Sequence, residues 1–387
     1  MKILQVHNFY QRPGGEDQVC AAEYELLKSH GQLVVQYLKH NNALHSMSPL
    51  AAGVRTVWNR AAYREIRDLI QRERPDVVHA HNTFPIVSPA LYYAACAESV
   101  PVVQTLHNYR LLCPDATFFR DGRVCEECLH RSVPYRSVLH GCYRNSRAAT
   151  AAVAGMLTAH RITGTWRTKI NTYIALTHFS RHKFIEGGLP ADRIVVKPNC
   201  LIMDPGSGAG DGGYALFVGR LAEDKGIRPL LNAWECLGSA IPLKIASDGP
   251  LAAWVKERVA ALPSVEWLGH CERDTLSKLY QRARFTVFPS QNFEGMPMTI
   301  IESFACGTPV IASALGSMNE IVTDGVTGLR FRPGDEQDLV ARVRGVLARP
   351  EQLTAMRSAA RLFYEQNYTA ERNYGLLMDI YQRAIQQ

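Results

Sequence analysis

Two glutamates that lie eight positions apart form the clearest chemical pattern in the chain. Glu294 and Glu302 belong to the segment 290–313, which reads SQNFEGMPMTIIESFACGTPVIAS. The apolar run RFTVFPS before them predicts a buried strand, and residues 298–306 predict a helix that a glycine and a proline bring to an end. Glu294 is therefore expected in the loop after a strand, and Glu302 about one turn inside the next helix. A phosphate group can bind at the N-terminus of such a helix, where free N–H groups and the helix dipole favour negative charge.

Two cations follow an earlier predicted strand. Residues 214–218 read as a strand, and Gly219, Arg220 and, five residues later, Lys225 come after it. An arginine can fork across phosphate oxygens and a lysine adds a point charge, so this pair can bind the diphosphate of a nucleotide. Cations this close together are also common as plain surface charges, and the residue types alone leave both interpretations open.

A glycine-containing loop follows the first predicted strand, residues 2–7. It reads Pro13-Gly14-Gly15-Glu16 and opens a helix. Glycines there let backbone N–H groups approach a ligand without a Cβ in the way. The loop differs from the Gly-x-Gly-x-x-Gly fingerprint, so dinucleotide binding gains no support. A helix N-terminus whose acidic residues complement the dipole would need no ligand, and both interpretations can hold together.

Strands and helices alternate along the chain, which predicts parallel sheets with helices on both faces. Ligands of such sheets bind beyond the carboxyl ends of the strands. Three histidines fall at strand ends of this kind: His79, His81 and His107. A lone histidine at a strand end is more often a loop or packing residue. The further expected strands are 33–38, 77–80, 100–106, 243–246, 265–268 and 285–288.

Four cysteines interrupt this alternation. Cys113, Cys125, Cys128 and Cys142 fall within thirty residues, with eleven residues before and thirteen after the Cys-Glu-Glu-Cys pair. Four thiolates can close a tetrahedral site that stabilises a polar segment, so we expect a structural zinc ion. The outer spacings match no standard zinc ribbon. Redox-active thiols, an iron–sulfur cluster and ordinary thiols remain the alternatives.

Composition limits the classes of protein. The chain has 387 residues, of which 47% are hydrophobic and 9% aromatic, and this is enough for two domains of ordinary size. No stretch reaches the length that spans a bilayer, and the N-terminus MKILQVH lacks the pattern of a signal peptide. We therefore expect a cytoplasmic protein whose ten cysteines are thiols or metal ligands.

The positive charge is concentrated in the first half. Residues 1–200 carry 24 Lys and Arg against 15 Asp and Glu, a balance of +9, whereas residues 201–387 carry 19 against 21, a balance of −2. Such a bias suits an anionic lipid surface, a pyrophosphate-bearing substrate or nucleic acid, or it only solubilises the protein. No nucleic-acid-binding pattern is present, so we expect no nucleic acid partner.

The chain resembles the retaining glycosyltransferases of family 4, which have the GT-B fold of two Rossmann-like, doubly wound parallel-sheet domains facing a cleft. The resemblance rests on the two glutamates and on four further segments in the expected order: VKPN at 196–199, FVGRLAEDKGI at 217–227, ASDGPL at 246–251 and VEWLGH at 265–270. It implies an N-terminal acceptor-binding domain over 1–199 with a cysteine-bearing insert at 107–170. A nucleotide-sugar-binding domain over 200–370 follows, and a final helix, 371–387, packs back onto the first domain.

The resemblance also implies roles for single residues. Arg220 and Lys225 would stabilise the departing diphosphate, Glu302 would accept hydrogen bonds from the ribose, and His107 would line the donor sugar's pocket. The implied catalytic residues are His107, Arg220, Lys225 and Glu294. The implied donor-binding residues are Gly14, Gly15, Glu16, Gly219, Gly295, Met296, Pro297, Met298, Thr299 and Glu302.

The implied activity is retaining transfer of a hexose from a UDP- or GDP-linked sugar to a glycan or polyprenyl-linked glycan in bacterial polysaccharide biosynthesis. Many relatives rest on the inner face of the membrane, and the basic and aromatic residues of the insert suit such contact. No Asp-x-Asp motif appears where a metal-dependent transferase needs one, so no catalytic metal is expected. The alternatives are a sugar-nucleotide epimerase or phosphorylase of the same fold, a catalytically silent module of glycan assembly, and a zinc-dependent nucleic-acid protein.

Overall fold

The computed structural model describes residues 1–11 and 14–387, which form two compact units. The first unit contains Met1–Phe118, Cys125–Ile202 and Ala370–Gln387, and the second contains Phe119–Val124 and Met203–Thr369. Each unit is built on one six-stranded parallel sheet with helices on both faces.

The sheet of the first unit has the strand order β2-β1-β3-β4-β7-β8, and every neighbouring pair is parallel. Its central strands are buried over almost their whole length, as expected for strands covered on both faces. The order reverses between β1 and β3, and ligands of such sheets bind at this point, beyond the carboxyl ends of the strands. The strands are β1 (Lys2–Phe9), β2 (Leu33–His40), β3 (Val77–Ala80), β4 (Val102–Leu106), β7 (Thr172–Ala175) and β8 (Ile194–Val196).

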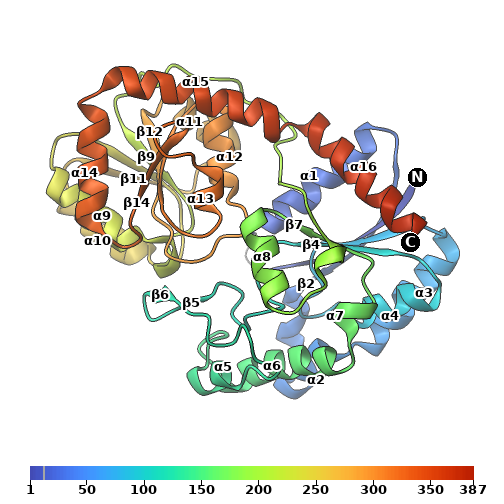
Figure 1. Cartoon of the computed structure of the whole chain (residues 1–387). Helices are drawn as coiled ribbons and strands as arrows, with labels where there is room; N and C mark the ends of the chain where they lie inside the picture. The colour runs from blue at the N-terminus through green and yellow to red at the C-terminus, as the bar shows by residue number, and fades with distance from the viewer. Residues whose placement is uncertain (12–13) are drawn as a thin grey trace. The chain divides into compact units, whose positions relative to one another are not determined.

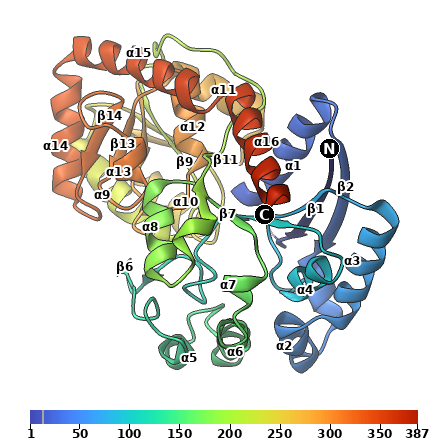
Figure 2. The same ribbon diagram turned by 45° about the vertical axis from the view of Figure 1, so that its right-hand side comes forward.

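Helices α1 and α16 cover one face of this sheet. The buried cluster on that face joins Ile3 and Val77 of the strands to Leu27 of α1 and to Leu377 and Tyr381 of α16. The C-terminal segment that we expected to pack on the first domain therefore forms α16. Figures 1 and 2 show α3 and α4 on the opposite side of the sheet. The helices of this unit are α1 (Gly15–Ser29), α2 (Pro49–Val57), α3 (Arg60–Glu73), α4 (Ala90–Ala97), α5 (Tyr135–His140), α6 (Arg147–Ile162), α7 (Thr165–Thr168), α8 (His178–Glu186) and α16 (Ala370–Gln386), with 3₁₀ turns at Asn41–Ser46 and Ala191–Arg193.

The sheet of the second unit has the order β11-β10-β9-β12-β13-β14, again entirely parallel. One large apolar cluster packs α9, α10 and α14 on one face, and a smaller cluster packs α11 on the other. The order reverses between β9 and β12. The strands are β9 (Ala215–Val218), β10 (Leu243–Ala246), β11 (Val265–Gly269), β12 (Phe285–Phe288), β13 (Val310–Ser313) and β14 (Gly328–Phe331). The helices are α9 (Ile227–Leu237), α10 (Ala252–Ala260), α11 (Arg273–Arg282), α12 (Met298–Ala305), α13 (Met318–Ile321), α14 (Glu336–Leu347) and α15 (Pro350–Asn367), with a 3₁₀ turn at Glu223–Lys225.

One part of the expected division into domains differs in the structure. We expected the whole insert, 107–170, in the first domain, but the short hairpin of β5 (Phe119–Arg120) and β6 (Arg123–Val124) groups with the second unit. A hairpin of two-residue strands has no core of its own, and nothing in its local sequence shows which unit it joins.

Candidate functional site

In the second unit, the predicted cations lie at the point where the strand order reverses. Lys225, after β9, forms an ion pair with Glu294, which follows β12. Its Nζ also lies 3.8 Å from Oδ2 of Asp224. Arg220 is exposed, with its Nη2 3.5 Å from Oδ1 of the same Asp224. The structure therefore brings Lys225 and Glu294 into contact, although 68 residues separate them in the chain, and Asp224 joins both cations into one charged group.

Gly226 allows the loops after β9 and β12 to approach each other. Its φ is +70°, and a Cβ at this position would lie 2.0 Å from the carbonyl oxygen of Pro289, so only glycine fits. The contact continues where the Gln291 N–H donates to the carbonyl of Asp224 at 2.8 Å and Asn292 Nδ2 donates to its Oδ2 at 2.9 Å. Asp224 thus holds the second loop with both its backbone and its side chain.

Hydroxyl groups fix the carboxylate of Glu294 and the turn after it. Ser290 Oγ donates to Glu294 Oε1 at 2.6 Å. Ser317 Oγ lies 2.6 Å from the carbonyl oxygen of Glu294 and 2.9 Å from that of Gly295. The predicted donor-binding turn therefore has a defined backbone before any ligand binds.

Helix α12 begins directly after this turn. No side chain caps its N-terminus at Pro297, so the N–H groups of Met298 and Thr299 in its first turn are not occupied by a capping side chain. Thr299 Oγ1 lies 3.4 Å from the carbonyl oxygen of Val218 and ties the helix to the end of β9. Such an N-terminus favours an anion.

Glu302 lies on the first turns of α12, as expected, and its carboxylate is largely buried. Tyr280 of α11 donates to its Oε2 at 3.0 Å. Burial raises the pKa of Glu302, while the hydrogen bond from Tyr280 and the charge of Arg273 lower it and offset part of that effect. Glu302 therefore holds one defined orientation and keeps a second carboxylate oxygen for other donors.

In the first unit, the glycine loop lies at the N-terminus of α1. A Cβ on Gly14 or Gly15 would meet no atom within 4 Å, so the space beside this turn is open. The Gly14 N–H donates to Oδ2 of Asp17 at 2.9 Å, and Oδ1 of Asp17 lies 2.7 Å from His7 Nε2. Pro13, which we included in the loop, lies outside the described residues.

Glu16 points into the unit rather than along the helix surface. Its Oε2 accepts a hydrogen bond from Asn108 Nδ2 at 2.8 Å, and Tyr10 bonds to the same carboxyl group. Its Oε1 is buried and has no hydrogen-bond partner among residues 1–11 and 14–387. Burial raises the pKa of Glu16. Glu16 is therefore linked to the region of His107, because its hydrogen-bond partner Asn108 is the next residue in the chain.

His107 follows β4 and is the end of a line of hydrogen bonds. Its Nε2 lies 3.0 Å from Nδ1 of His81, and Nε2 of His81 lies 3.1 Å from Oε1 of Glu23. Nε2 of His81 also lies 3.4 Å from Nε2 of Gln5, so polar side chains on both sides hold its ring in place. Burial, with the neighbouring histidines, holds the pKa of His107 well below its usual value, so the imidazole is neutral.

Behind this line, His79 and Lys197 surround the same glutamate. Nδ1 of His79 lies 2.9 Å from Glu23 Oε1 and 2.6 Å from the hydroxyl of Tyr381 on α16. Lys197 Nζ lies 3.2 Å from Glu23 Oε2. Glu23, His79 and His81 are the one group of three in the described part of the chain whose ligand atoms lie close enough for a metal ion. Lys197 already supplies the positive charge there and would repel a divalent cation, so the group is an ion-pair network.

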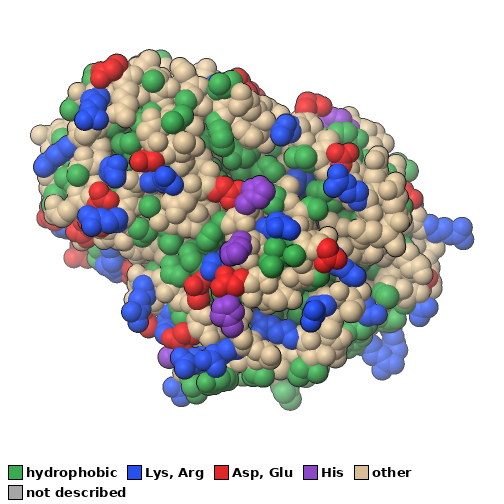
Figure 3. Space-filling view, viewed as in Figure 1, with side chains coloured by type: hydrophobic (Ala, Val, Ile, Leu, Met, Phe, Trp, Pro, Cys, Tyr) green, Lys and Arg blue, Asp and Glu red, His purple; other side chains and the backbone are tan. Residues whose placement is uncertain are grey.

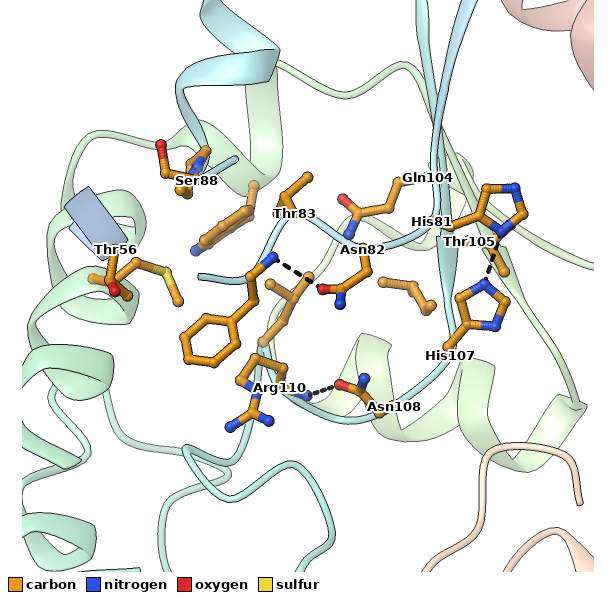
Figure 4. A pocket seen from close by; sticks show the side chains of 16 residues that line it. Thr56, His81, Asn82, Thr83, Ser88, Gln104, Thr105, His107, Asn108 and Arg110 are labelled. Carbon is orange, nitrogen blue, oxygen red and sulfur yellow. Dashed lines mark hydrogen bonds between the residues drawn. The ribbon is translucent and has the colours of Figure 1, made fainter. Parts of the chain in front are cut away.

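A pocket opens beside His107 and is lined entirely by the first unit (Figure 4). The enclosed space is small, about 40 Å³, which admits one functional group of a ligand rather than a whole sugar residue. His81 and His107 lie at one end and Thr56 and Ser88 at the other, with Arg110 along the lower wall. The remaining lining residues are Asn82, Thr83, Phe84, Pro89, Gln104, Thr105, Leu106, Asn108, Leu111, Met156 and Trp166.

Two family descriptions match nearly the whole chain in succession. "Glycosyltransferase Family 4" matches residues 18–203, and "Glycosyl transferases group 1" matches residues 205–363. The chain belongs to the glycosyltransferases. The two matched regions meet at the boundary between the two units.

Among curated relatives, a glycogen synthase of Mycobacterium tuberculosis is 34% identical over 154 residues, which cover 38% of this glycosyltransferase and 36% of that protein. The chain thus matches about a third of the length of that relative. The Arabidopsis thaliana sulfoquinovosyl transferase SQD2 is 25% identical over 303 residues, 76% of this chain and 54% of that one.

Solved structures share the fold. The Anabaena protein HepE, solved in complex with UDP, aligns over 98% of this chain and 99% of its own with a TM-score of 0.70 and 19% identity. This likeness shows the architecture and confirms the expected GT-B class of two parallel-sheet α/β domains.

Among the four clustered cysteines, Cys128 interacts electrostatically with both Cys113 and Cys125. Within the described residues, no three of their sulfur atoms lie within 4.8 Å of one another. Burial raises the pKa of Cys113 to about 12 and also raises the pKa of Cys128, so both are protonated thiols. The structural zinc ion stays a prediction, and no step of the chemistry depends on it.

Several residues of these sites escaped the sequence analysis. Asp224, Tyr280 and Glu23 had no assigned role, and His81 was given little weight. Each acts through a partner far away in the chain, so no local pattern marks it. The one available signal was the position of His81 at a strand end next to that of His107.

None of the helices in the described residues is both long and apolar enough to cross a bilayer.

Proposed function

We propose that this glycosyltransferase moves a hexose from a nucleotide sugar to a glycan or lipid-linked glycan, with retention of the anomeric configuration. The observation that carries the proposal is the group at the reversal point of the second sheet. There Lys225 and Glu294 meet beside the uncapped N-terminus of α12, and Glu302 lies further along the same helix. Retention is supported by the spacing of the two glutamates, which resembles that of retaining family 4 enzymes.

The donor is a UDP-hexose, with GDP-hexoses as the alternative. HepE, which shares the fold, has been solved in complexes with UDP and with UDP-glucose. In the present chain, the free oxygen of Glu302 is suited to accept hydrogen bonds from the ribose hydroxyls. The N–H groups of α12 and the cations Lys225 and Arg220 are suited to the diphosphate.

Charge stabilisation is the main chemical contribution of the second unit. Transfer breaks the bond between the anomeric carbon and the phosphate oxygen and forms one to the acceptor oxygen, while the acceptor's proton passes to the departing phosphate. Lys225 and Arg220 are preorganised for the negative charge that develops there. Because Lys225 pairs with Glu294 in the structure, a diphosphate competes with that carboxylate for it. We expect no catalytic metal ion, since these cations occupy that role.

In the first unit, the neutral imidazole of His107 is suited to hydrogen-bond to a hydroxyl group. The contact of its Nε2 with Nδ1 of His81 at 3.0 Å orients the ring. Glu16 presents an acceptor, its buried Oε1. Both are suited to orient sugar hydroxyls.

We also propose that the protein binds to an anionic membrane surface. Helices α2, α5 and α6 lie along one edge of the first unit in both ribbon views, and lysine and arginine side chains gather over α5 and α6 (Figures 1, 2 and 3). Apolar side chains are exposed on the same helices, with Leu50 at 78%, Val54 at 59% and Leu139 at 60%. Basic and apolar side chains together are typical of interfacial binding. The nearby arginines are Arg131, Arg136, Arg144 and Arg147.

A turnover assay tests the proposed activity. UDP-glucose, UDP-galactose and GDP-mannose are each incubated with the protein and a bacterial polyprenyl-linked glycan extract, and nucleotide release is followed with and without the extract. We expect release of UDP only with the acceptor, and at least a hundredfold loss for Lys225→Met. Glu257→Gln, an exposed glutamate on α10 of the same unit, is the matched control that keeps full activity.

The same assay separates the alternatives. Conversion of one sugar nucleotide into another without acceptor indicates an epimerase, and a requirement for inorganic phosphate indicates a phosphorylase. Nucleotide binding without any turnover indicates a silent assembly module.

A further inference from the structure

Two side chains of the pocket in the first unit have donor N–H groups with no partner among the described residues, and two of its amide oxygens are already engaged. The indole N–H of Trp166 has no hydrogen-bond partner, although the residue is only 4% exposed. The side-chain oxygens of Asn82 and Gln104 are already engaged, since they accept from the Phe84 N–H at 2.9 Å and from the Tyr92 hydroxyl at 2.7 Å. A buried donor without an acceptor costs about 1–3 kcal/mol, so such a group points to a ligand that supplies oxygen atoms.

Arg110 adds the one permanent charge of the pocket lining. No aspartate or glutamate is among the sixteen residues that line it. The guanidinium lies 4.4 Å from the ring centre of Phe84 and 5.1 Å from that of Tyr143, and its Nη1 donates to the carbonyl of Pro114. These contacts fix the plane of the group. Its Nε is buried and has no hydrogen-bond partner in the described part of the chain. A fixed, charged donor is suited to a carboxylate or phosphate oxygen.

One carboxylate nearby moderates this charge. Asp115, on the loop after Arg110, attracts the same guanidinium, and Tyr10 contacts it. Neither residue lines the pocket. Asp115 thus offsets part of the positive charge of Arg110 from outside the pocket. We therefore expect an anionic ligand to bind about tenfold more tightly than a neutral one, rather than several hundredfold.

His107 lies at the other end of the same pocket. It is three residues from Arg110, so their Cα atoms are at most about 10 Å apart. Figure 4 shows both side chains on the pocket wall, with Asn108 between them.

We propose that this pocket is an acceptor subsite for a negatively charged group, a carboxylate or phosphate that binds to Arg110 and Trp166. The inference rests on the proposed glycosyl transfer, and it gives the acceptor a chemical class, an acidic sugar or a phosphate-bearing glycan. The group's charge pairs with the guanidinium, and its second oxygen accepts the indole N–H.

The test compares three probes of similar size by calorimetric titration: methyl glucuronide, glycerol 3-phosphate and the neutral methyl glucoside. We expect at least one of the two anions to bind about tenfold more tightly than the glucoside. The stronger of the two identifies the source of the charge, an acidic sugar or a phosphate headgroup. Equal binding of all three probes would overturn the proposal.

Single variants test the two hydrogen-bond-donating side chains, Arg110 and Trp166, separately. Arg110→Gln should abolish the preference for the anion, and Trp166→Phe, which keeps the ring but removes the N–H, should weaken the anion about three- to tenfold. Arg64→Gln, an exposed arginine on α3 of the same unit, is the matched control and should retain the preference. If Arg110→Gln and Trp166→Phe both bind the anion as the wild type does, the assignment is wrong.

UDP titration of the same preparations separates a failure of the proposed donor site from a failure of the proposed acceptor subsite. Normal UDP binding in both variants shows that they are folded and that the second unit is intact. Failure of UDP to bind to the wild type contradicts the proposed function, whereas UDP binding without any preference for anions contradicts only the acceptor subsite.

Discussion

Glu23 is the residue whose charge organises the centre of the first unit. It is 4% exposed and receives Lys197, His79 and His81 on its two oxygens. Lys197 and His79 hold the pKa of Glu23 well below its usual value against the effect of burial, so it is ionised. Glu23 lies against His81, which contacts His107, and this makes Glu23 a positioning residue.

Replacement of Glu23 by glutamine should therefore be costly. The variant keeps the shape of the side chain but leaves the charge of Lys197 uncompensated, which costs about 3–5 kcal/mol in a buried pair. Glu65→Gln, whose carboxylate is 47% exposed and pairs with Lys39, should cost less than about 1 kcal/mol. Urea unfolding measures both. Similar losses for the two variants would contradict a central role for Glu23.

Acid should weaken the protein through the same histidines. Burial and the neighbouring His79 lower the pKa of His81 from 6.5 to about 4. Between these values the unfolded chain binds a proton that the folded chain does not, so the free energy of unfolding falls as the pH falls. The slope for one such histidine is about 1.4 kcal/mol per pH unit. Urea unfolding at several pH values between 7 and 4 should show this fall, and His81→Gln should reduce its slope.

At the scale of elements, the approach of the β9 and β12 loops forms the proposed donor site. Gly226→Ala would place a Cβ 2.0 Å from the Pro289 carbonyl oxygen at a φ of +70°. We expect a loss of about 3 kcal/mol and a clear loss of nucleotide binding, because the loops that carry Lys225 and Glu294 must separate.

Gly325→Ala is the matched control for this substitution. Its φ is +78°, yet a Cβ there would meet nothing within 4 Å. It should cost about 1 kcal/mol from backbone strain alone and leave nucleotide binding unchanged. Equal effects of the two substitutions would show that strain, rather than the contact between the loops, decides the result.

The elements themselves were largely predictable, whereas their partners were not. The apolar runs that form β9, β12 and α12 stand out in the sequence, because burial on both faces requires them. The pair of Lys225 and Glu294 could be placed only through the resemblance to a family. Tyr280 and Asp224 needed the structure, since the choice of partner depends on packing between distant segments. The hairpin of β5 and β6 groups with the second unit, and no local pattern in its sequence indicates this.

At the scale of the whole molecule, the uneven charge predicts where the protein binds. At low salt, the protein should sediment with vesicles of phosphatidylcholine that contain about a third phosphatidylglycerol. It should not sediment with neutral vesicles. The triple variant Arg131→Gln, Arg136→Gln and Arg147→Gln should lose most of this binding. A control that removes three cations from the second unit, Arg282→Gln, Arg284→Gln and Arg330→Gln, should keep it. Binding that is equal for neutral and anionic vesicles would contradict the proposed electrostatic contact.

The central claim is that the second unit binds a nucleotide sugar through Glu302 and its neighbours. Calorimetric titration with UDP and GDP, on the wild type, Glu302→Gln and the exposed control Glu257→Gln, tests it most directly. We predict that one nucleotide, UDP first, binds to the wild type and to Glu257→Gln with equal affinity, and at least tenfold more weakly to Glu302→Gln, which loses the charge-assisted bonds to the ribose. If neither nucleotide binds to the folded wild type, or if Glu302→Gln binds as tightly as the wild type, the donor site is wrongly assigned.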